Sequence, residues 1–184
     1  MDNSERLNYR GTSTTNLAKA AMFTALAVGS GYALILVPNI ELITAIVFIS
    51  GVYLGVSWGI IVGILAEFVF STLNPMGSGL LFLPLLIAQI VSMAIVGLAG
   101  GLLQYVLKIR NWTLTKMIFL GAIGAILTFV YDSLTTLSYP VAAGFEWKQT
   151  MVLYLSGIGF TVLHQISNAI IFFMVLPRVF SRID

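Results

Sequence analysis

Residues 70–84 read FSTLNPMGSGLLFLP, a short polar turn set between two long apolar runs. The polar, small and helix-breaking residues of this turn are Asn74, Pro75, Gly77, Ser78 and Gly79. Because proline and glycine interrupt regular helices, the stretch predicts that one apolar helix ends before the turn and another begins after it. The same alternation of apolar runs and short polar links recurs along the chain, so the turn indicates the organisation of the whole protein.

The composition places these helices in a membrane. Hydrophobic residues make up 59% of the chain and charged residues only 9%, whereas soluble domains carry about 25% charged residues. The net charge of +2 and the absence of basic residues interleaved with aromatic ones exclude a nucleic-acid partner. The absence of cysteine excludes disulfides, thiolate metal sites and cysteine nucleophiles, and we expect no removable signal peptide. We therefore predict an all-α integral membrane protein.

Six apolar runs are candidates for spanning helices, each of which needs about 20 apolar residues. They cover residues 16–37, 41–55, 57–73, 80–106, 113–138 and 150–176. Gly55 is expected to end the second helix and Ser57 to cap the third. Helices this short are expected to line a cavity or to be covered by neighbours. The prediction is a six-helix membrane domain over 16–177, between tails at 1–15 and 178–184.

The basic residues predict the orientation of these helices. Lys148 alone lies on one side, and the other eight lie on the opposite side, in the tails or around the link between the fourth and fifth runs: Arg6, Arg10, Lys19, Lys108, Arg110, Lys116, Arg178 and Arg182. By the positive-inside rule, both termini are predicted to be cytoplasmic. The links 38–40, 74–79 and 139–149 would then face the exterior.

Polar side chains within the apolar runs are the candidates for a binding site, since ionisable groups in a membrane are costly. Most of them fall in the outer half of the predicted domain, where they could line a cavity open to the outside. Three alternatives stay open: Glu67 and His164 could pair as a contact between helices, the ionisable groups could relay protons, and Trp147 could belong to an interfacial aromatic belt. Glu41 could equally serve as a helix cap. The predicted ligand contacts are Asn39, Glu41, Asn74, Gln89, Tyr131, Asp132, Trp147 and His164.

Two pairs of small residues at four-residue spacing predict close helix packing. Gly59 and Gly63 form one pair, and Ala21 and Ala25 form the other, which Gly29 continues. If the alanine pair faces outward, it is a docking surface for another membrane protein; otherwise it is ordinary packing.

Together these features resemble the substrate-binding S-components of the energy-coupling factor (ECF) family of vitamin importers. The resemblance lies in Ala21 and Ala25, in PNIELITAIVFISGVYLG at 38–55, in FSTLNPMGSG at 70–79 and in the pair Ala88–Gln89. It extends to a branch of the family whose ligands include corrinoids such as cobalamin.

The resemblance implies a multi-pass protein of a bacterial cell membrane that captures a vitamin-class solute from outside. Partner subunits would complete the importer: a transmembrane coupling protein that docks on Ala21 and Ala25, and two cytosolic ATPases. The chain itself would be no enzyme and would need no cofactor or metal, and it carries no glycine-rich phosphate loop. The opening turn would be a gating loop, bent by Pro75 and made mobile by Gly77 and Gly79.

Two other classes remain alternatives. One is a stand-alone secondary transporter or channel. The other is an intramembrane serine protease of the rhomboid type, in which Ser78 and His164 would be nucleophile and base. Rhomboids carry Gly-x-Ser-Gly, and Met76 stands here at the first glycine position.

Overall fold

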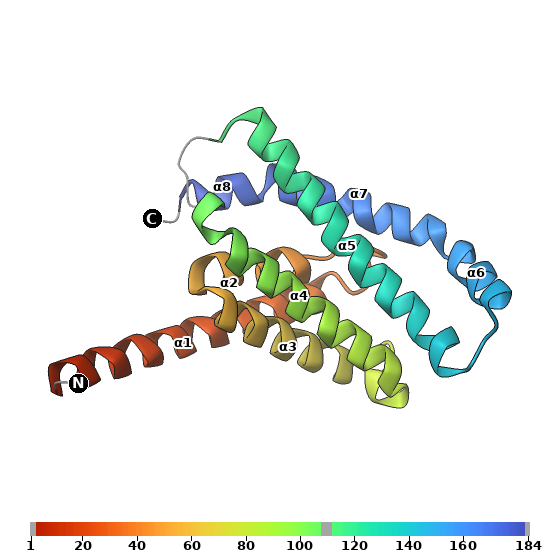
Figure 1. Ribbon diagram of the computed structural model, residues 1–184, viewed down its shortest axis with the longest axis horizontal. Helices are drawn as coiled ribbons and strands as arrows, with labels where there is room; N and C mark the ends of the chain where they lie inside the picture. The colour runs from red at the N-terminus through yellow and green to blue at the C-terminus, as the bar shows by residue number, and fades with distance from the viewer. Residues whose placement is uncertain (1–2, 108–111, 183–184) are drawn as a thin grey trace.

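The computed structural model describes residues 3–107 and 112–182, with side chains from residue 14 onward. Within these ranges every regular element is a helix (Figure 1), which confirms the all-α class. The elements are α1 (Asn3–Ala33), α2 (Ile43–Leu54), α3 (Val56–Thr72), the short 3-10 turn η1 (Gly79–Leu81), α4 (Leu83–Leu107), α5 (Leu114–Ala142), α6 (Trp147–Ser156), α7 (Ile158–Met174) and α8 (Leu176–Phe180). Lys108 and Arg110, which contributed to the predicted orientation, lie outside the described residues.

Three segments are long and apolar enough to cross a membrane: Leu83–Leu107, Leu114–Ala142 and Ile158–Phe180. Helices α2 and α3 are apolar but shorter. Every residue of α2 from Ile43 to Val52 is buried. Its neighbours therefore cover it, as expected for a short helix inside a membrane protein.

A single residue, Gly55, forms the junction between α2 and α3. Gly55 has φ 87° and ψ 176° and serves both as the C-cap of α2 and as the N-cap of α3. Glycine adopts this conformation without steric cost. The prediction that Gly55 ends a helix is confirmed, but the capping role assigned to Ser57 is wrong, because α3 has already begun at Val56.

The last predicted run is interrupted. The helix is interrupted at Gly157, between α6 and α7. The interruption lies within the sequence Ser156-Gly157-Ile158-Gly159, whose glycines have low helix propensity. The single helix predicted over 150–176 is therefore wrong. His164 lies in the second turn of α7 rather than deep within one long helix.

Helices α2, α3 and α4 meet along a seam of glycines, at which their backbones lie in close contact. A Cβ atom placed on Gly97 would overlap the backbone oxygen of Gly59, and one on Gly63 would overlap that of Met93. The predicted close packing at Gly59 and Gly63 is confirmed. We call this set the glycine seam: Gly51, Gly59, Gly63, Gly97, Gly100 and Gly101.

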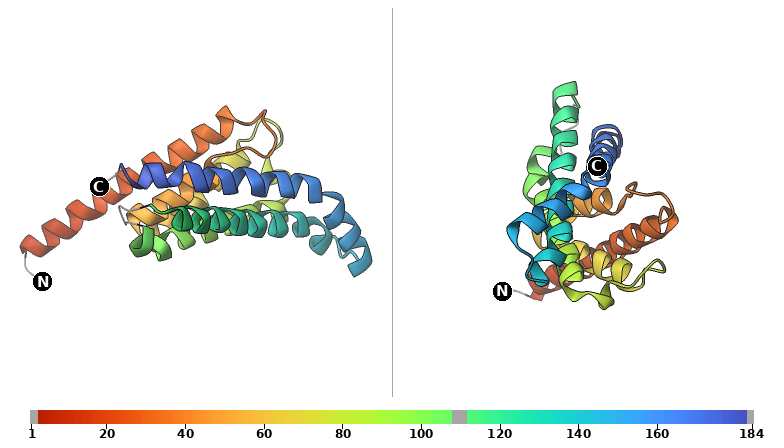
Figure 2. Two further views of the ribbon diagram at one scale, coloured as in Figure 1. Left: turned by 90° about the horizontal axis from the view of Figure 1, so that it is seen from above. Right: turned by 90° about the vertical axis from the view of Figure 1, so that its right-hand side faces the viewer.

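The remaining helices flank this unit. Helix α1 packs on α3 and α2, while α5 packs on α4 and α7. In Figure 2 the start of α1 and helix α8 lie toward one end of the molecule, and the links after α1 and α3 lie away from it. Those two links, 34–42 and 73–78, frame the cavity described next.

Candidate functional site

A cavity of about 490 Å³ lies between the 34–42 and 73–78 links and helices α3, α5 and α7. Its volume is within the roughly 300–1,000 Å³ typical of sites for small organic ligands. Most of its wall is apolar, and a few polar side chains converge on it. Of the predicted ligand contacts, those that line it are Asn39, Glu41, Asn74, Tyr131, Asp132 and His164.

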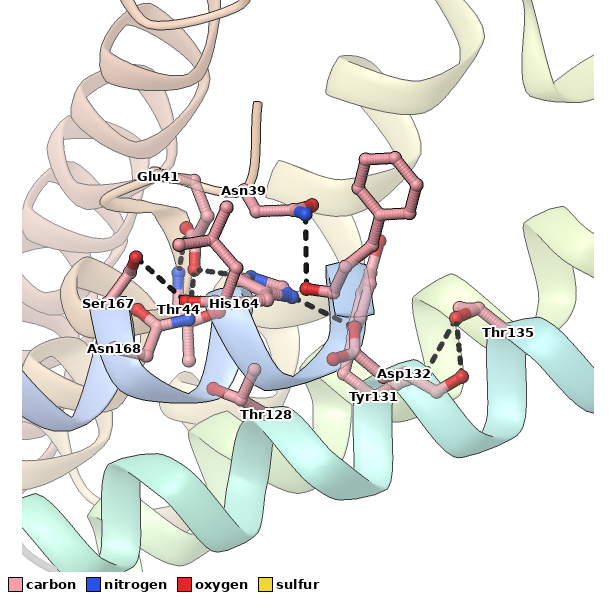
Figure 3. Close-up of polar contacts among 12 residues, drawn as sticks. Asn39, Glu41, Thr44, Thr128, Tyr131, Asp132, Thr135, His164, Ser167 and Asn168 are labelled. Atoms are coloured by element: carbon pink, nitrogen blue, oxygen red, sulfur yellow. Dashed lines mark hydrogen bonds and ion pairs between the residues drawn. The ribbon is translucent and has the colours of Figure 1, made fainter. Parts of the chain in front are cut away.

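His164 joins two carboxylates that come from distant parts of the chain (Figure 3). Its Nδ1 lies 2.8 Å from Oδ1 of Asp132 on α5. Its Nε2 lies 3.7 Å from Oε1 of Glu41, which is too long for a hydrogen bond. The alternative in which His164 pairs with Glu67 is therefore wrong, because Asp132 occupies Nδ1 and Glu41 is the carboxylate nearest Nε2.

Glu41 both caps a helix and connects two helices. Its Oε2 accepts a hydrogen bond of 2.9 Å from the backbone N–H of Thr44 in the first turn of α2. Its Oε1 accepts another of 2.9 Å from Nδ2 of Asn168 on α7. The capping alternative for Glu41 is confirmed, and the same carboxylate also lines the cavity.

Glu67 forms a second polar group on the wall formed by α3. It is 1% exposed, and its Oε1 accepts hydrogen bonds from Ser71 Oγ at 2.7 Å and from Tyr131 Oη at 3.3 Å. Gln89 Nε2 in turn donates to Tyr131 Oη at 3.4 Å. Gln89 is thus placed behind Tyr131, outside the residues that line the cavity.

Several buried polar atoms around the cavity have no hydrogen-bond partner among the described residues. They are Gln89 Oε1, Asp132 Oδ2, His164 Nε2 and Asn168 Oδ1. Buried polar atoms are nearly always satisfied in folded proteins, so such a group beside a cavity is suited to receive a ligand or water. In the described part of the chain, no group of three His, Asp or Glu side chains is placed to hold a metal ion.

Asn39 lies in the 34–42 link, where it adopts a left-handed conformation with φ 57°. Its Nδ2 donates to the backbone oxygen of Phe160 at 3.1 Å. This bond ties the link to the first turn of α7, on the other side of the cavity.

The turn at 74–79 is held by its own residues. Asn74 Oδ1 accepts from Met76 N at 2.9 Å, and the backbone oxygen of Asn74 accepts from Gly77 N at 3.1 Å. Gly77 has φ 148° and nothing near its Cβ position. Ser78 Oγ donates to the Thr72 oxygen at 2.8 Å and accepts from Leu80 N at 3.3 Å, so it is engaged locally rather than with His164.

Trp147 lies apart from these residues. It is the first residue of α6, is 75% exposed and does not line the cavity. Its position suits the interfacial belt, which was the alternative to ligand stacking.

Ala21 and Ala25 face outward on α1. Both are exposed, and they line a shallow groove with Leu65 and Val69 of α3. They are absent from the wall of the cavity, so the two surfaces are separate.

The ligand contacts predicted from the sequence omit two residues that complete the polar groups around the cavity. Glu67 lines the cavity, and Asn168 holds Glu41. Each lies four residues from a partner in the same group, Ser71 for Glu67 and His164 for Asn168. Residues at that spacing share one helix face. This pattern could have added Glu67 and Asn168 to the residues predicted for the site.

We expect Tyr131→Phe to lower stability by about 1–3 kcal/mol, because it removes a hydroxyl that serves Glu67 and Gln89 at once and leaves Gln89 Nε2 without an acceptor. Thermal unfolding in detergent measures this effect. The matched control is Tyr139→Phe, since the Tyr139 hydroxyl makes no hydrogen bond to another described residue and the side chain is half exposed. Equal midpoints for the two variants would contradict the assigned role of Tyr131.

The chain was compared with known proteins, and no protein-family model, no curated protein and no solved structure matches it.

Proposed function

We propose that this chain is the substrate-binding subunit of an ATP-driven micronutrient importer. It binds a vitamin-class solute in the cavity between the two links, and a coupling protein and two ATPases complete its import. The observation that carries the proposal is the cavity itself. Polar side chains from three helices and two links converge there, and two of their buried atoms, Asp132 Oδ2 and His164 Nε2, lack a hydrogen-bond partner among the described residues.

In this proposal the chain crosses the membrane six times with both termini in the cytoplasm, and the cavity opens outward. The distribution of charge supports that orientation. Neither link that frames the cavity contains a lysine or an arginine, whereas Lys19, Lys116, Arg178 and Arg182 gather toward the other side of the predicted topology.

The size of the cavity bears on the ligand. A corrinoid is the class that the resemblance favours, but a volume of about 490 Å³ encloses a drug-sized molecule. A corrinoid would bind with much of its macrocycle outside the cavity, whereas a smaller vitamin would be enclosed. In this proposal the chain acts as a binding protein without catalysis. Ser78, the nucleophile of the protease alternative, is hydrogen-bonded to Thr72 and Leu80 rather than to His164.

The test is to purify the protein alone in mild detergent, release any bound molecule by denaturation and identify it by mass spectrometry. We expect one stoichiometric vitamin-like compound, and an absorption spectrum of the intact sample shows directly whether it is a corrinoid. His164→Ala should reduce its retention at least about tenfold, equivalent to about 1.4 kcal/mol. Gln165→Ala is the matched control, since Gln165 neighbours His164 but does not line the cavity.

A protein that is empty and binds none of a panel of vitamins would contradict the proposal. Transport by the purified chain in liposomes without ATPases would replace it with the secondary transporter. Loss of the bound compound in both α7 variants would show that retention depends on α7 as a whole rather than on the cavity.

A further inference from the structure

Most of the ionisable side chains that line the cavity are acidic. Three carboxylates line it, on Glu41, Glu67 and Asp132, together with one histidine, His164. Of the described residues, no lysine or arginine lines the cavity. A single imidazolium can offset only one carboxylate, so His164 does not bring this wall to a positive charge in either of its protonation states.

His164 lies beside two of the three carboxylates, and the third, Glu67, has no cationic side chain hydrogen-bonded to it in the described part of the chain. His164 stands between Asp132, at 2.8 Å from Nδ1, and Glu41, at 3.7 Å from Nε2. Glu67 lies on α3 and receives only neutral hydroxyl donors, from Ser71 and Tyr131. Among the described residues, no cationic side chain is hydrogen-bonded to Glu67.

Unpartnered atoms give a second, independent observation. Glu67 is 1% exposed, both of its hydrogen bonds go to Oε1, and Oε2 makes none with another described residue. Asp132 Oδ2 is buried without a partner. Nε2 of His164, a residue that is 9% exposed and lines the cavity, has no hydrogen-bond partner among the described residues. A buried carboxylate oxygen without a donor, such as Asp132 Oδ2, is costly, and a ligand that brings an N–H donor and positive charge relieves that cost.

We infer that the cavity selects a cationic solute, one that presents a protonated amine or an amidinium group to Glu67 and Asp132. This inference rests on the proposed function, because it specifies the ligand of the same binding site. Phe70 and Tyr131 line the cavity beside these carboxylates, and aromatic faces attract cations. An anionic solute would meet three carboxylates, with His164 and no lysine or arginine among the described lining residues to offset them.

Three probes of the same shape test the charge selectivity. Benzamidine, benzamide and benzoate each place one small polar group on a single aromatic ring, and they are a cation, a neutral molecule and an anion. Binding is measured on the purified full chain in detergent by calorimetry or by ligand-observed NMR at millimolar probe concentrations. We expect benzamidine to bind at least about tenfold more tightly than benzamide, and benzoate not to bind.

Neutralising variants locate the effect. Glu67→Gln and Asp132→Asn should each remove most of the preference for benzamidine over benzamide. The matched control is Glu146→Gln, which changes the net charge equally at the N-cap of α6, away from the cavity. If one cavity variant fails to fold, the other still tests the inference, since the two carboxylates come from different helices.

The outcomes separate this inference from the proposed function. Equal affinity for benzamidine and benzamide, no binding of any probe, or a preference that survives both cavity variants overturns the inference. A neutral or anionic vitamin that co-purifies overturns it too, while leaving the importer proposal intact. Charge selectivity in a protein that binds no micronutrient supports the inference on the site and refutes the proposed function.

Discussion

Replacing Ala21 and Ala25 together by tryptophan is expected to reduce solute uptake to background while changing ligand affinity less than twofold. Both alanines are exposed on α1 and line a groove with Leu65 and Val69. Small residues at this spacing allow a second helix to approach closely, and two indole rings would hold it away. The cavity has none of these four residues in its wall, so binding should survive.

Uptake is measured in cells that co-express a coupling protein and its ATPases, and affinity is measured on the purified chain. The control is the double variant Ala122→Trp and Ile126→Trp, at two exposed positions of α5 with the same four-residue spacing. It should transport normally. Normal uptake in the α1 variant would reduce the alanine pair to ordinary packing, and loss of uptake in both variants would show that the indole rings harm the protein wherever they are placed.

Gly97→Ala is expected to destabilise the protein by about 1–3 kcal/mol, the usual range for overpacking a tight interior, or to prevent its purification as a single species. A Cβ atom at Gly97 would overlap the backbone oxygen of Gly59 and also crowd the nitrogen of Ile60. Backbone atoms cannot rotate aside as a side chain does, so α3 and α4 would have to separate along the glycine seam. Unfolding midpoints and elution profiles in one detergent measure the effect.

Gly159→Ala is the matched control for this variant. Gly159 lies on α7, and nothing stands within 4 Å of its Cβ position. Alanine there should be neutral or stabilising by up to about 1 kcal/mol, because glycine disfavours helices. If both substitutions cost the same, the seam would not be the reason for the loss at Gly97.

The sequence predicted those features that depend on local chemistry. The long apolar runs predicted the all-helical class, and Gly55 predicted the end of α2. Gly59 and Gly63 predicted that α3 packs closely against another helix, which is α4. Each of these follows from residues that lie next to one another along the chain. The polar residues singled out in the sequence also include most of the polar side chains that line the cavity, since buried polar groups tend to gather where water or a ligand can reach them.

Partnerships across the fold could not be predicted in the same way. His164 pairs with Asp132 rather than with Glu67, because the packing of α5 against α7 decides which carboxylate reaches the imidazole. Gln89 supports Tyr131 from behind rather than facing the cavity. The break at Gly157 was missed because the flanking residues are apolar enough to continue a helix, and hydropathy does not register a loss of helix propensity.

Asn39 fulfils two requirements with one side chain. Its backbone adopts a left-handed conformation that glycine adopts freely and asparagine more readily than most other residues. Its amide meanwhile donates to Phe160. Glycine at this position would keep the conformation and lose the bond, whereas glutamine would keep an amide and resist the conformation. The range of residues acceptable at position 39 is therefore narrower than its partly exposed position in a loop suggests.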